Sequence, residues 1–344
     1  MPKVELHLHL EGAIPLDAMW SLVERRGGDP DVPDPAALAA RFAYRDFAHF
    51  IETWVWKNRF LDSYEALEIA AEAVAADLER RTVRYAEAFF SPSDLEGFGL
   101  APERVALAIR RGLARVSGAE VALIVDVVRD TGPRRAARTL DRVLEVAAEA
   151  EVIGIGIGGS EAEFPPEQFA AVYRRARRAG LHTTAHAGEA AGPDSVWGAL
   201  RALEAERIGH GVRSVEDPAL VRHLVEHRIP LEVCPTSNLR TGVVSSWEVH
   251  PARDLIAAGA VVTINSDDPA MFGCSLAGEY REVATRFGLG DAAVRRLAEA
   301  AVESSWAEPS HKERLAAELA SWWGDRDGPQ ARHCYPRAHD PGGA

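Results

Sequence analysis

The sequence predicts a (β/α)8 barrel, and three observations lead to this prediction. Eight short apolar runs recur along the 344-residue chain, and several of them are almost continuous in Val, Ile and Leu. Such runs are typical of parallel strands that are covered on both faces. Amphipathic stretches lie between the runs, and an alternation of strand and helix favours a parallel sheet. The chain is long for one domain, but a barrel with insertions reaches this length.

In chain order, the apolar runs give eight predicted strands: Val4–His9, Val83–Phe90, Val121–Val127, Val152–Ile157, Leu181–His186, Arg207–His210, Pro230–Cys234 and Val261–Ser266. Between the strands, apolar side chains recur three or four positions apart, as one face of a helix requires. This spacing is clear at Val105, Ile109, Leu113 and Val116, and again at Leu140, Val143, Leu144 and Ala147.

The connection after the first strand, residues 15–80, is far longer than an ordinary loop. It contains an aromatic-rich stretch, Asp46–Phe60, and a long predicted helix, Tyr64–Arg80. Because this insertion follows the carboxyl end of a strand, it belongs to the face on which barrels carry their active sites. We therefore expect a helical lid, in which three aromatic residues either wall a pocket or form the lid's own core: Trp54, Trp56 and Phe60.

After the eighth strand, two more helices are predicted, at Asp291–Ala307 and His311–Trp323. No internal repeat or linker divides the chain, so residues 1–325 are expected to form one domain. Residues 326–344 are rich in Gly, Pro and Arg and are expected to form a flexible C-terminal tail.

The composition argues against several kinds of partner. The chain is 47% hydrophobic and 26% charged, with a net charge of −13 and no basic stripe, so neither nucleic acid nor an anionic membrane surface is expected to bind it. No apolar run approaches the roughly 20 residues that span a bilayer. The three cysteines form no C-x-x-C pair, and the first residues do not resemble a secretory signal. These features favour a cytoplasmic protein and leave its oligomeric state open.

The first predicted strand ends in His7-Leu8-His9. Alternate residues of a strand point to the same side, so both histidines can reach a metal ion in the mouth of the barrel. Two histidines at a strand edge would also suit an ordinary polar surface. This motif alone is weak support for a metal site.

Three more predicted strands end in the same residue types: the fifth in His186, the sixth in His210 and the eighth in Asp267-Asp268. Each one alone would fit a rim residue or a solvated turn. Together they place histidine or aspartate at four strand ends on the catalytic face of the barrel. Histidine and carboxylate ligands without thiolates suit a catalytic zinc ion, which lowers the pKa of a bound water to about 7.

Six ordered motifs of this chain resemble the signature of the adenosine deaminase family, in the metal-dependent hydrolase superfamily. They run from the first strand to beyond the eighth: His7-Leu-His9-Leu-Glu11-Gly, Gly154-Ile-Gly-Ile-Gly-Gly-Ser-Glu161, His186-Ala-Gly-Glu189, Gly209-His210-Gly, Cys234-Pro-Thr-Ser-Asn238 and Ser266-Asp267-Asp268-Pro269. The resemblance implies a barrel enzyme that removes the 6-amino group of an adenine-like base as ammonia.

The resemblance also implies one Zn²⁺ ion per chain, with the ligands His7, His9, His186 and Asp267. It implies that Glu189 gives a proton to purine N1, that His210 orients and helps to deprotonate the attacking water, and that Asp268 contacts N7. Substrate contacts would further include His9, Glu11 and the backbone N–H of Gly159. A ring nitrogen must gain a proton as water attacks C6, and a glutamic acid kept protonated by a closed pocket can supply it. Ser237 is expected either to contact His210 or to be a turn residue.

Two positions depart from the nucleoside-acting pattern. Glu11 stands where many such members carry Asp near the 5′-hydroxyl of the sugar, and Ser160 stands where they often carry Asp. Adenosine is the expected substrate, with inosine as the product. Aminodeoxyfutalosine deaminases, which serve menaquinone synthesis, and adenine deaminases of the same family are the alternatives.

Two other classes of protein are alternatives to a deaminase on a barrel of this kind. Related hydrolases of amides or phosphoesters commonly carry a carboxylated lysine at a strand end, but the chain's three lysines, Lys3, Lys57 and Lys312, lie elsewhere. This favours a single metal. A non-catalytic relative would have lost Glu189 or a metal ligand, and the chain keeps them all.

Overall fold

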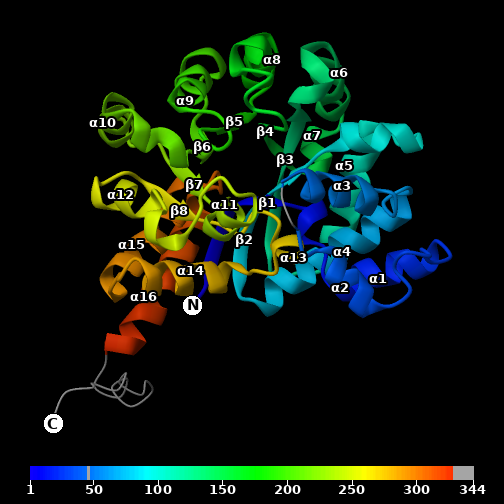
Figure 1. The fold of residues 1–344 in the computed structure, drawn as a ribbon, viewed down its shortest axis with the longest axis horizontal. Helices are drawn as coiled ribbons and strands as arrows, with labels where there is room; N and C mark the ends of the chain where they lie inside the picture. Colours follow the sequence, from blue (N-terminus) through cyan, green and yellow to red (C-terminus); the bar gives the residue numbers. More distant parts are fainter. Residues whose placement is uncertain (45–46, 328–344) are drawn as a thin grey trace.

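Eight parallel strands form the centre of the structure, a computed structural model that describes residues 1–44 and 47–327. Strands that are neighbours in the sequence are neighbours in the sheet, in the order β1 to β8 (Figure 1). They are β1 (Lys3–His9), β2 (Val83–Phe90), β3 (Glu120–Val128), β4 (Val152–Gly158), β5 (His182–Ala187), β6 (Arg207–His210), β7 (Leu231–Val233) and β8 (Val262–Ile264). All eight predicted strands are thereby confirmed, with small shifts at their ends.

The barrel closes where the residue after β8 meets the first strand. A parallel bridge joins Leu8 to Asp267. The N–H of His9 donates to the carbonyl of Asp267 at 2.9 Å, and the N–H of Asp267 donates to the carbonyl of His7 at 3.1 Å. The closing hydrogen bonds therefore involve three of the residues predicted to bind the metal.

Helices surround the barrel in Figure 1 and cover its outer face. Their amphipathic faces are those that the spacing predicts: Val105, Ile109 and Leu113 are buried on α5, as are Leu140 and Val143 on α6. The helices are α1 (Leu16–Arg25), α2 (Pro35–Arg41), α3 (Phe47–Asn58), α4 (Tyr64–Arg80), α5 (Pro102–Leu113), α6 (Gly132–Leu144), α7 (Ala147–Ala150), α8 (Ala170–Arg178), α9 (Pro193–Gly198), α10 (Pro218–Glu226), α11 (Pro235–Arg240), α12 (Ala252–Ala257), α13 (Pro269–Phe272), α14 (Leu276–Arg286), α15 (Asp291–Ser304) and α16 (Pro309–Asp327).

Helices α1 to α4 make up the connection between β1 and β2. The side chain of Ser63 caps the longest of them, α4, by accepting a hydrogen bond from the N–H of Ala66. α4 buries an apolar face and packs against α5 at Gly112, where an added Cβ would overlap the carbonyl of Glu68. This connection is thus attached to the barrel through its second half.

The aromatic-rich stretch predicted at Asp46–Phe60 forms α3, although Asp46 itself lies outside the described residues. Its aromatic side chains divide between the two expected roles. Trp56 and Phe60 belong to the buried core, whereas Trp54 lines a cavity at the mouth of the barrel.

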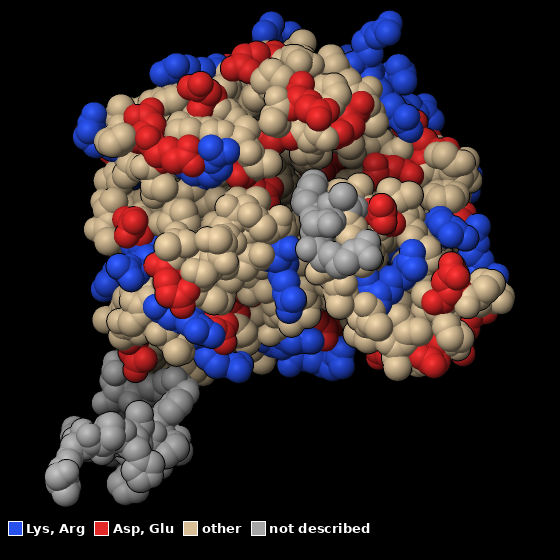
Figure 2. Space-filling view, in the orientation of Figure 1, with Lys and Arg blue, Asp and Glu red and all other residues tan. Residues whose placement is uncertain are grey.

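The two C-terminal helices are also present, with ends that differ from the prediction. α15 stops at Ser304 rather than at Ala307, and α16 starts at Pro309. Most of the predicted tail, residues 328–344, lies outside the described part of the chain. No helix in the described part is both long enough and apolar enough to cross a bilayer. On the face shown in Figure 2, acidic and basic side chains are interspersed.

Candidate active site

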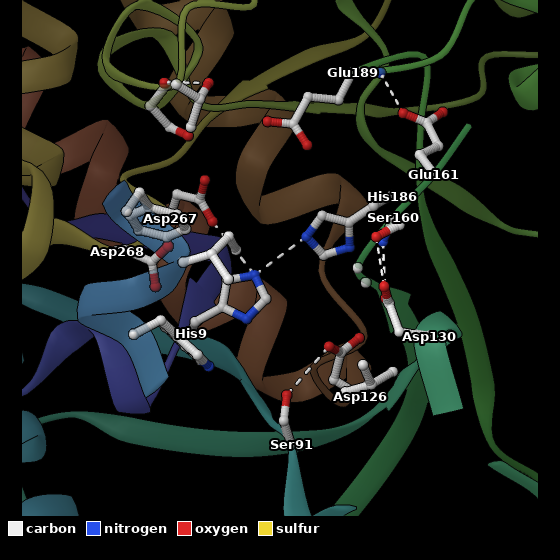
Figure 3. Close-up of a pocket in the computed structure, with 18 of the residues that line it drawn as sticks. His9, Ser91, Asp126, Asp130, Ser160, Glu161, His186, Glu189, Asp267 and Asp268 are labelled. Atoms are coloured by element: carbon white, nitrogen blue, oxygen red, sulfur yellow. Dashed lines mark hydrogen bonds and ion pairs between the residues drawn. The ribbon is translucent and has the colours of Figure 1, made fainter. Parts of the chain in front are cut away.

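Five predicted site residues meet at the carboxyl ends of β1, β5, β6 and β8. One ligand atom each from His7, His186, His210 and Asp267 lies within 4.8 Å of the others. His9 joins the same cluster, because its Nε2 lies 3.1 Å from Nε2 of His186 and 3.3 Å from Oδ1 of Asp267. Figure 3 shows His9 and His186 facing one another in the pocket.

The donor atoms of this cluster fit a bound cation. The two ring nitrogens of His9 and His186 face each other at hydrogen-bond distance, and the buried Nε2 of His7 has no hydrogen-bond partner. Burial lowers the pKa of His9 to about 4 and that of His186 well below its usual range, so both of these candidate ligands are neutral. Despite its burial, the pKa of His7 is raised to about 10 by Asp267 and Glu232, so this ring must release a proton when a metal binds. Nitrogen and carboxylate donors in one small volume suit zinc.

His210 and Asp267 have left-handed backbones, with φ of 58° and 63°. This region is costly for residues other than glycine and is typical of functional sites. His210 ends β6, and Asp267 follows β8 by three residues, so both turns aim a side chain into the barrel mouth. The other non-glycine residues with positive φ in the described part lie outside the site: Thr82, Glu151, Glu204 and Arg228.

Glu189 reaches the cluster from the loop after β5. Its Oε2 lies 3.6 Å from Nε2 of His210, and its side chain is 20% exposed. Burial, the charge of Asp267 and the charge of Glu161 raise the pKa of Glu189 to about 8, so that it carries a proton near neutral pH. Glu161 fixes the loop by accepting hydrogen bonds from the backbone N–H groups of Gly188, Glu189 and Ala191. The sequence reasoning assigned no role to Glu161, although the residue ends the second motif.

The hydrogen-bond partner of His210 differs from the expected one. The side-chain amide of Asn238 lies 3.1 Å from Nδ1 of His210, whereas the hydroxyl of Ser237 has no hydrogen-bond partner. Helix α11 begins at Pro235, and this start places Asn238, rather than Ser237, against the imidazole of His210. Ser237 lines the cavity instead.

Asp268 lies beside the cluster, and its Oδ1 is buried without a hydrogen-bond partner. Burial and the adjacent charge of Asp267 raise the pKa of Asp268 well above its usual range. Gly12, which follows Glu11 in the first sequence motif, makes room for this side chain, because a Cβ at Gly12 would overlap the Asp268 carboxylate. The glycine after Glu11 is therefore a packing requirement of the site.

Glu11 is buried behind the cavity and is not among the described residues that line it. Its Oε1 accepts a hydrogen bond from the N–H of Ser91 at 2.9 Å, and its carbonyl accepts one from Nζ of Lys57 at 2.7 Å. Its other carboxylate oxygen has no hydrogen-bond partner. Glu11 thus borders the cavity through Ser91.

Gly159 lines the cavity just after β4. Its φ of 99° and its closeness to the Asp130 carboxylate both require glycine. The hydroxyl of Ser160 binds Asp130 at 2.5 Å, and the N–H of Ser160 binds it at 2.9 Å. Ser160 therefore holds an acidic residue at the cavity wall (Figure 3).

The cavity has a volume of about 410 Å³ and extends from the His/Asp cluster to a second acidic group that the sequence reasoning missed. Asp94, Asp126 and Asp130 form this group, and Ser91 donates a hydrogen bond to Asp126 at 3.3 Å. Burial and the charges of Asp94 and Glu11 raise the pKa of Asp126 to about 8. These residues follow or end β2 and β3, so the strand-end rule could have found them.

Helix α3 supplies the apolar wall of the cavity, with Phe50, Ile51, Trp54 and Val55. Ile51 is 42% exposed and Val55 is 61% exposed, although both line the cavity. Nε1 of Trp54 donates to Asp94 at 3.2 Å and so connects α3 to the acidic end. An apolar rim and an acidic end thus face the same enclosed space.

Comparisons with known proteins agree on one family. The family model described as adenosine deaminase matches residues 2–322. An aminodeoxyfutalosine deaminase of Streptomyces avermitilis is 39% identical over 328 residues, which are 94% of this chain and 91% of that protein. The structure of an adenine deaminase from Arthrobacter aurescens is 31% identical, with a TM-score of 0.87 and coverage of 94% and 99%. An amidohydrolase structure from Burkholderia ambifaria with bound Zn is 29% identical, with a TM-score of 0.86 and coverage of 94% and 91%.

Proposed function

Since the chain belongs to the adenosine deaminase family and is a hydrolytic deaminase of C–N bonds, we propose that it converts adenosine to inosine and ammonia. The observation that carries this proposal is the position of Glu189. A protonated carboxylic acid lies 3.6 Å from His210, beside a cluster of metal-binding donors and inside a cavity of about 410 Å³. This arrangement suits proton delivery to an aromatic ring while water attacks it.

We propose that one Zn²⁺ ion is held by His7, His9, His186 and Asp267. When bound, zinc makes water nucleophilic near neutral pH by lowering its pKa. Elemental analysis of protein purified without added metal is expected to give one zinc per chain. Two tightly held metal ions per chain would contradict this mononuclear site.

Three residues of the chain are proposed to carry out separate steps of the reaction. Glu189 gives its proton to N1 of the purine, and this makes C6 more electrophilic. His210 orients the attacking water and assists its deprotonation. Asp268, whose pKa is raised by burial and by the charge of Asp267, contacts N7. Water adds at C6; one of its protons passes through His210 to the amino group, and the other restores the proton of Glu189. The C6–N bond breaks, the amino group leaves as ammonia, and N1 keeps the proton that Glu189 gave.

Two features support a nucleoside as the substrate. The backbone N–H of Gly159 is proposed to contact N3, and Ser91, which is hydrogen-bonded to the buried Glu11, is proposed to border the sugar. Among the described residues that line the cavity there is no Lys or Arg, whereas Asp94, Asp126 and Asp130 are acidic. A phosphate would be repelled by these carboxylates, so we expect the uncharged nucleoside to be preferred over its monophosphate.

One observation favours a second candidate substrate, aminodeoxyfutalosine. The Streptomyces relative with that activity in its name is 39% identical to this chain, and the apolar rim on α3 could hold an apolar 5′ extension. Free adenine is the other candidate, on the likeness to the Arthrobacter enzyme. All three substrates share the proposed chemistry at C6.

Ammonia release from adenosine, adenine, aminodeoxyfutalosine and AMP, compared as kcat/KM, tests the proposal. Adenosine is expected to exceed adenine by at least about tenfold, which corresponds to ~1.4 kcal/mol of transition-state binding. AMP, the 5′-monophosphate, is expected to be a poorer substrate than adenosine. Faster turnover of adenine than of any nucleoside would overturn the substrate assignment, and no ammonia from any of them would overturn the proposed function.

We also propose that the enzyme acts on its small purine substrate in a reducing cytoplasm, without nucleic acid or a membrane as partner. Cys234 and Cys274, the cysteines in the described part of the chain, are not joined in a disulfide. Free, largely buried cysteines suit that compartment.

A further inference from the structure

His7 is the most deeply placed member of the metal-binding cluster, and it has a charged partner on the side away from the cavity. Its Nδ1 lies 2.9 Å from Oε2 of Glu232, and both side chains are 0% exposed. Glu232 belongs to the middle of β7 rather than to a strand end, and it does not line the cavity. Its position suggests a role that is exerted through His7.

The other oxygen of Glu232 is already committed. Nε of Arg207 donates to Oε1 of Glu232 at 2.6 Å, and Nη2 of Arg207 donates to Glu87 at 2.5 Å. Arg207 is buried on β6, and its Nη1 donates to the carbonyl of Ser304 at 2.9 Å. Glu87 in turn accepts the backbone N–H of Trp306 at 2.5 Å. Glu232, Arg207 and Glu87 are therefore each held by fixed hydrogen-bond partners.

The donor and acceptor roles in this network follow from the chemistry of arginine. A guanidinium group can only donate, so Oε1 of Glu232 must accept from it. An ionised carboxylate has no proton to give, so Oε2 of Glu232 must also accept, and the proton that it accepts is on Nδ1 of His7. The remaining ring nitrogen of His7, Nε2, points at the cluster and has no hydrogen-bond partner of its own.

The ring of His7 is also held against rotation. A Cβ at Gly209 would lie 2.9 Å from Cε1 of His7, so the glycine leaves just enough space for the imidazole. The ring of Phe89 lies 4.8 Å away, measured between ring centroids. His7 therefore has a fixed ring plane as well as a fixed hydrogen-bond partner.

We propose that Glu232 is a positioning residue for the metal site: anchored by Arg207, it keeps the His7 proton on Nδ1 and so presents a bare Nε2 to the metal. This role goes beyond the proposed function, because it concerns how strongly the metal is held rather than which base is deaminated. Partners of this kind behind a ligand typically change metal affinity by about 10–100-fold when they are removed.

A pair of matched substitutions tests this role. In Glu232→Gln, the amide oxygen must face Arg207, so the NH2 group faces His7 Nδ1 and forces the ring proton onto Nε2. Zinc affinity, measured by competition with a chelator on the apo protein, is expected to fall by about 10–100-fold. Glu87→Gln removes the same charge from the other side of Arg207 and does not contact His7. It is expected to lose comparable thermal stability but to keep the wild-type zinc affinity.

Three results would overturn the role of Glu232. These are a Glu232→Gln variant with wild-type zinc affinity, an equal loss of affinity in both variants, and a zinc-loaded wild type whose His7 proton lies on Nε2. The position of the His7 proton is measured by NMR of protein with 15N-labelled histidines, with His7 assigned through its contact with Phe89. This measurement uses the wild type, so it tests the role even if Glu232→Gln does not fold. A wild type that binds no zinc at all would instead contradict the proposed function.

Discussion

Glu189 meets the requirements for donating a proton to a substrate ring. Its carboxyl group points into the cavity, its pKa is raised to about 8, and its loop is fixed by three backbone hydrogen bonds to Glu161. Glu161 therefore both positions the acid and, through its charge, helps to keep it protonated. The two glutamates act together, although 28 positions separate them in the chain.

Replacing Glu189 by Gln should leave the metal in place and remove most of the turnover. The amide fills the same space but cannot give up a proton, and a general acid contributes about 10²–10⁴-fold. Zinc content and kcat are measured on the same preparation. Near-normal kcat at full zinc content would remove Glu189 from the mechanism.

The pH profile gives a second view of the same residue. A general acid must be protonated, so kcat/KM of the wild type is expected to fall as the pH rises through the pKa of Glu189. That pKa is about 8 from burial and the neighbouring carboxylates, and a bound cation lowers it, so the fall should be centred at or below about pH 8. In Glu189→Gln this alkaline fall should be absent from the residual activity. An identical fall in the variant would assign it to another group.

At this scale, the sequence predicted residues that lie directly at strand ends better than residues that act from loops. His7, His186 and Asp267 converge as the strand-end rule requires, because a barrel brings all carboxyl ends to one face. Asn238 was missed because the start of α11 decides which residue faces His210. The burial of Glu11 behind Ser91 depends on the turn after β1, and no motif encodes that turn.

At the scale of elements, α3 is the segment that joins the insertion to the site. The sequence predicted its aromatic content and its place on the catalytic face, because both follow from local composition and chain order. It could not predict which turn of the helix borders the cavity, since that depends on contacts with distant residues, such as Trp54 with Asp94 and Phe50 with Phe272. Our proposal that residues 15–80 act as a lid rests on the four apolar side chains of α3 that line the cavity.

Val55→Asp tests this lid. Val55 is 61% exposed in the free protein, so the substitution should hardly affect stability, but it places a charge where the substrate would be covered. Losing apolar burial of a Val side chain costs up to ~1.5–3 kcal/mol, so KM for adenosine should rise by roughly tenfold with a smaller change in kcat.

Val249→Asp is the matched control for the lid. Val249 is 62% exposed, does not line the cavity, and belongs to the short turn Trp247–Val249. The KM of Val249→Asp for adenosine should equal that of the wild type. Equal kinetic constants in the two variants would mean that α3 does not contact the bound substrate.

At the scale of the whole molecule, the candidate metal site and the closure of the barrel share the same residues. His7, His9 and Asp267 provide both candidate ligands and the backbone hydrogen bonds between the first strand and the residue after the last. Barrel closure was predicted from the strand count alone. Its coincidence with the site was not, because it depends on the left-handed turn at Asp267.

Removing the metal should therefore lower the thermal stability of the entire barrel. Binding at 100 times Kd stabilises a folded protein by ~2.7 kcal/mol, which for a chain of this length corresponds to a drop in Tm of roughly 4 °C on chelation. Calorimetry with and without a chelator measures the shift, and added zinc should reverse it. His186→Ala, which lacks a ligand but keeps the closing hydrogen bonds, should show a much smaller shift. If chelation leaves the Tm of the wild type unchanged, metal binding does not stabilise the closed barrel.

The closure between Leu8 and Asp267 also sets when during synthesis the site can exist. Two of the candidate ligands lie in the first strand of the barrel, whereas Asp267 follows the last strand. A nascent chain that has not yet released β8 holds two histidines without the rest of their partners, and a metal site of this kind does not form in an unfolded chain. Metal loading is therefore expected only after all eight strands have been synthesised, and a bound ion would mark a finished barrel.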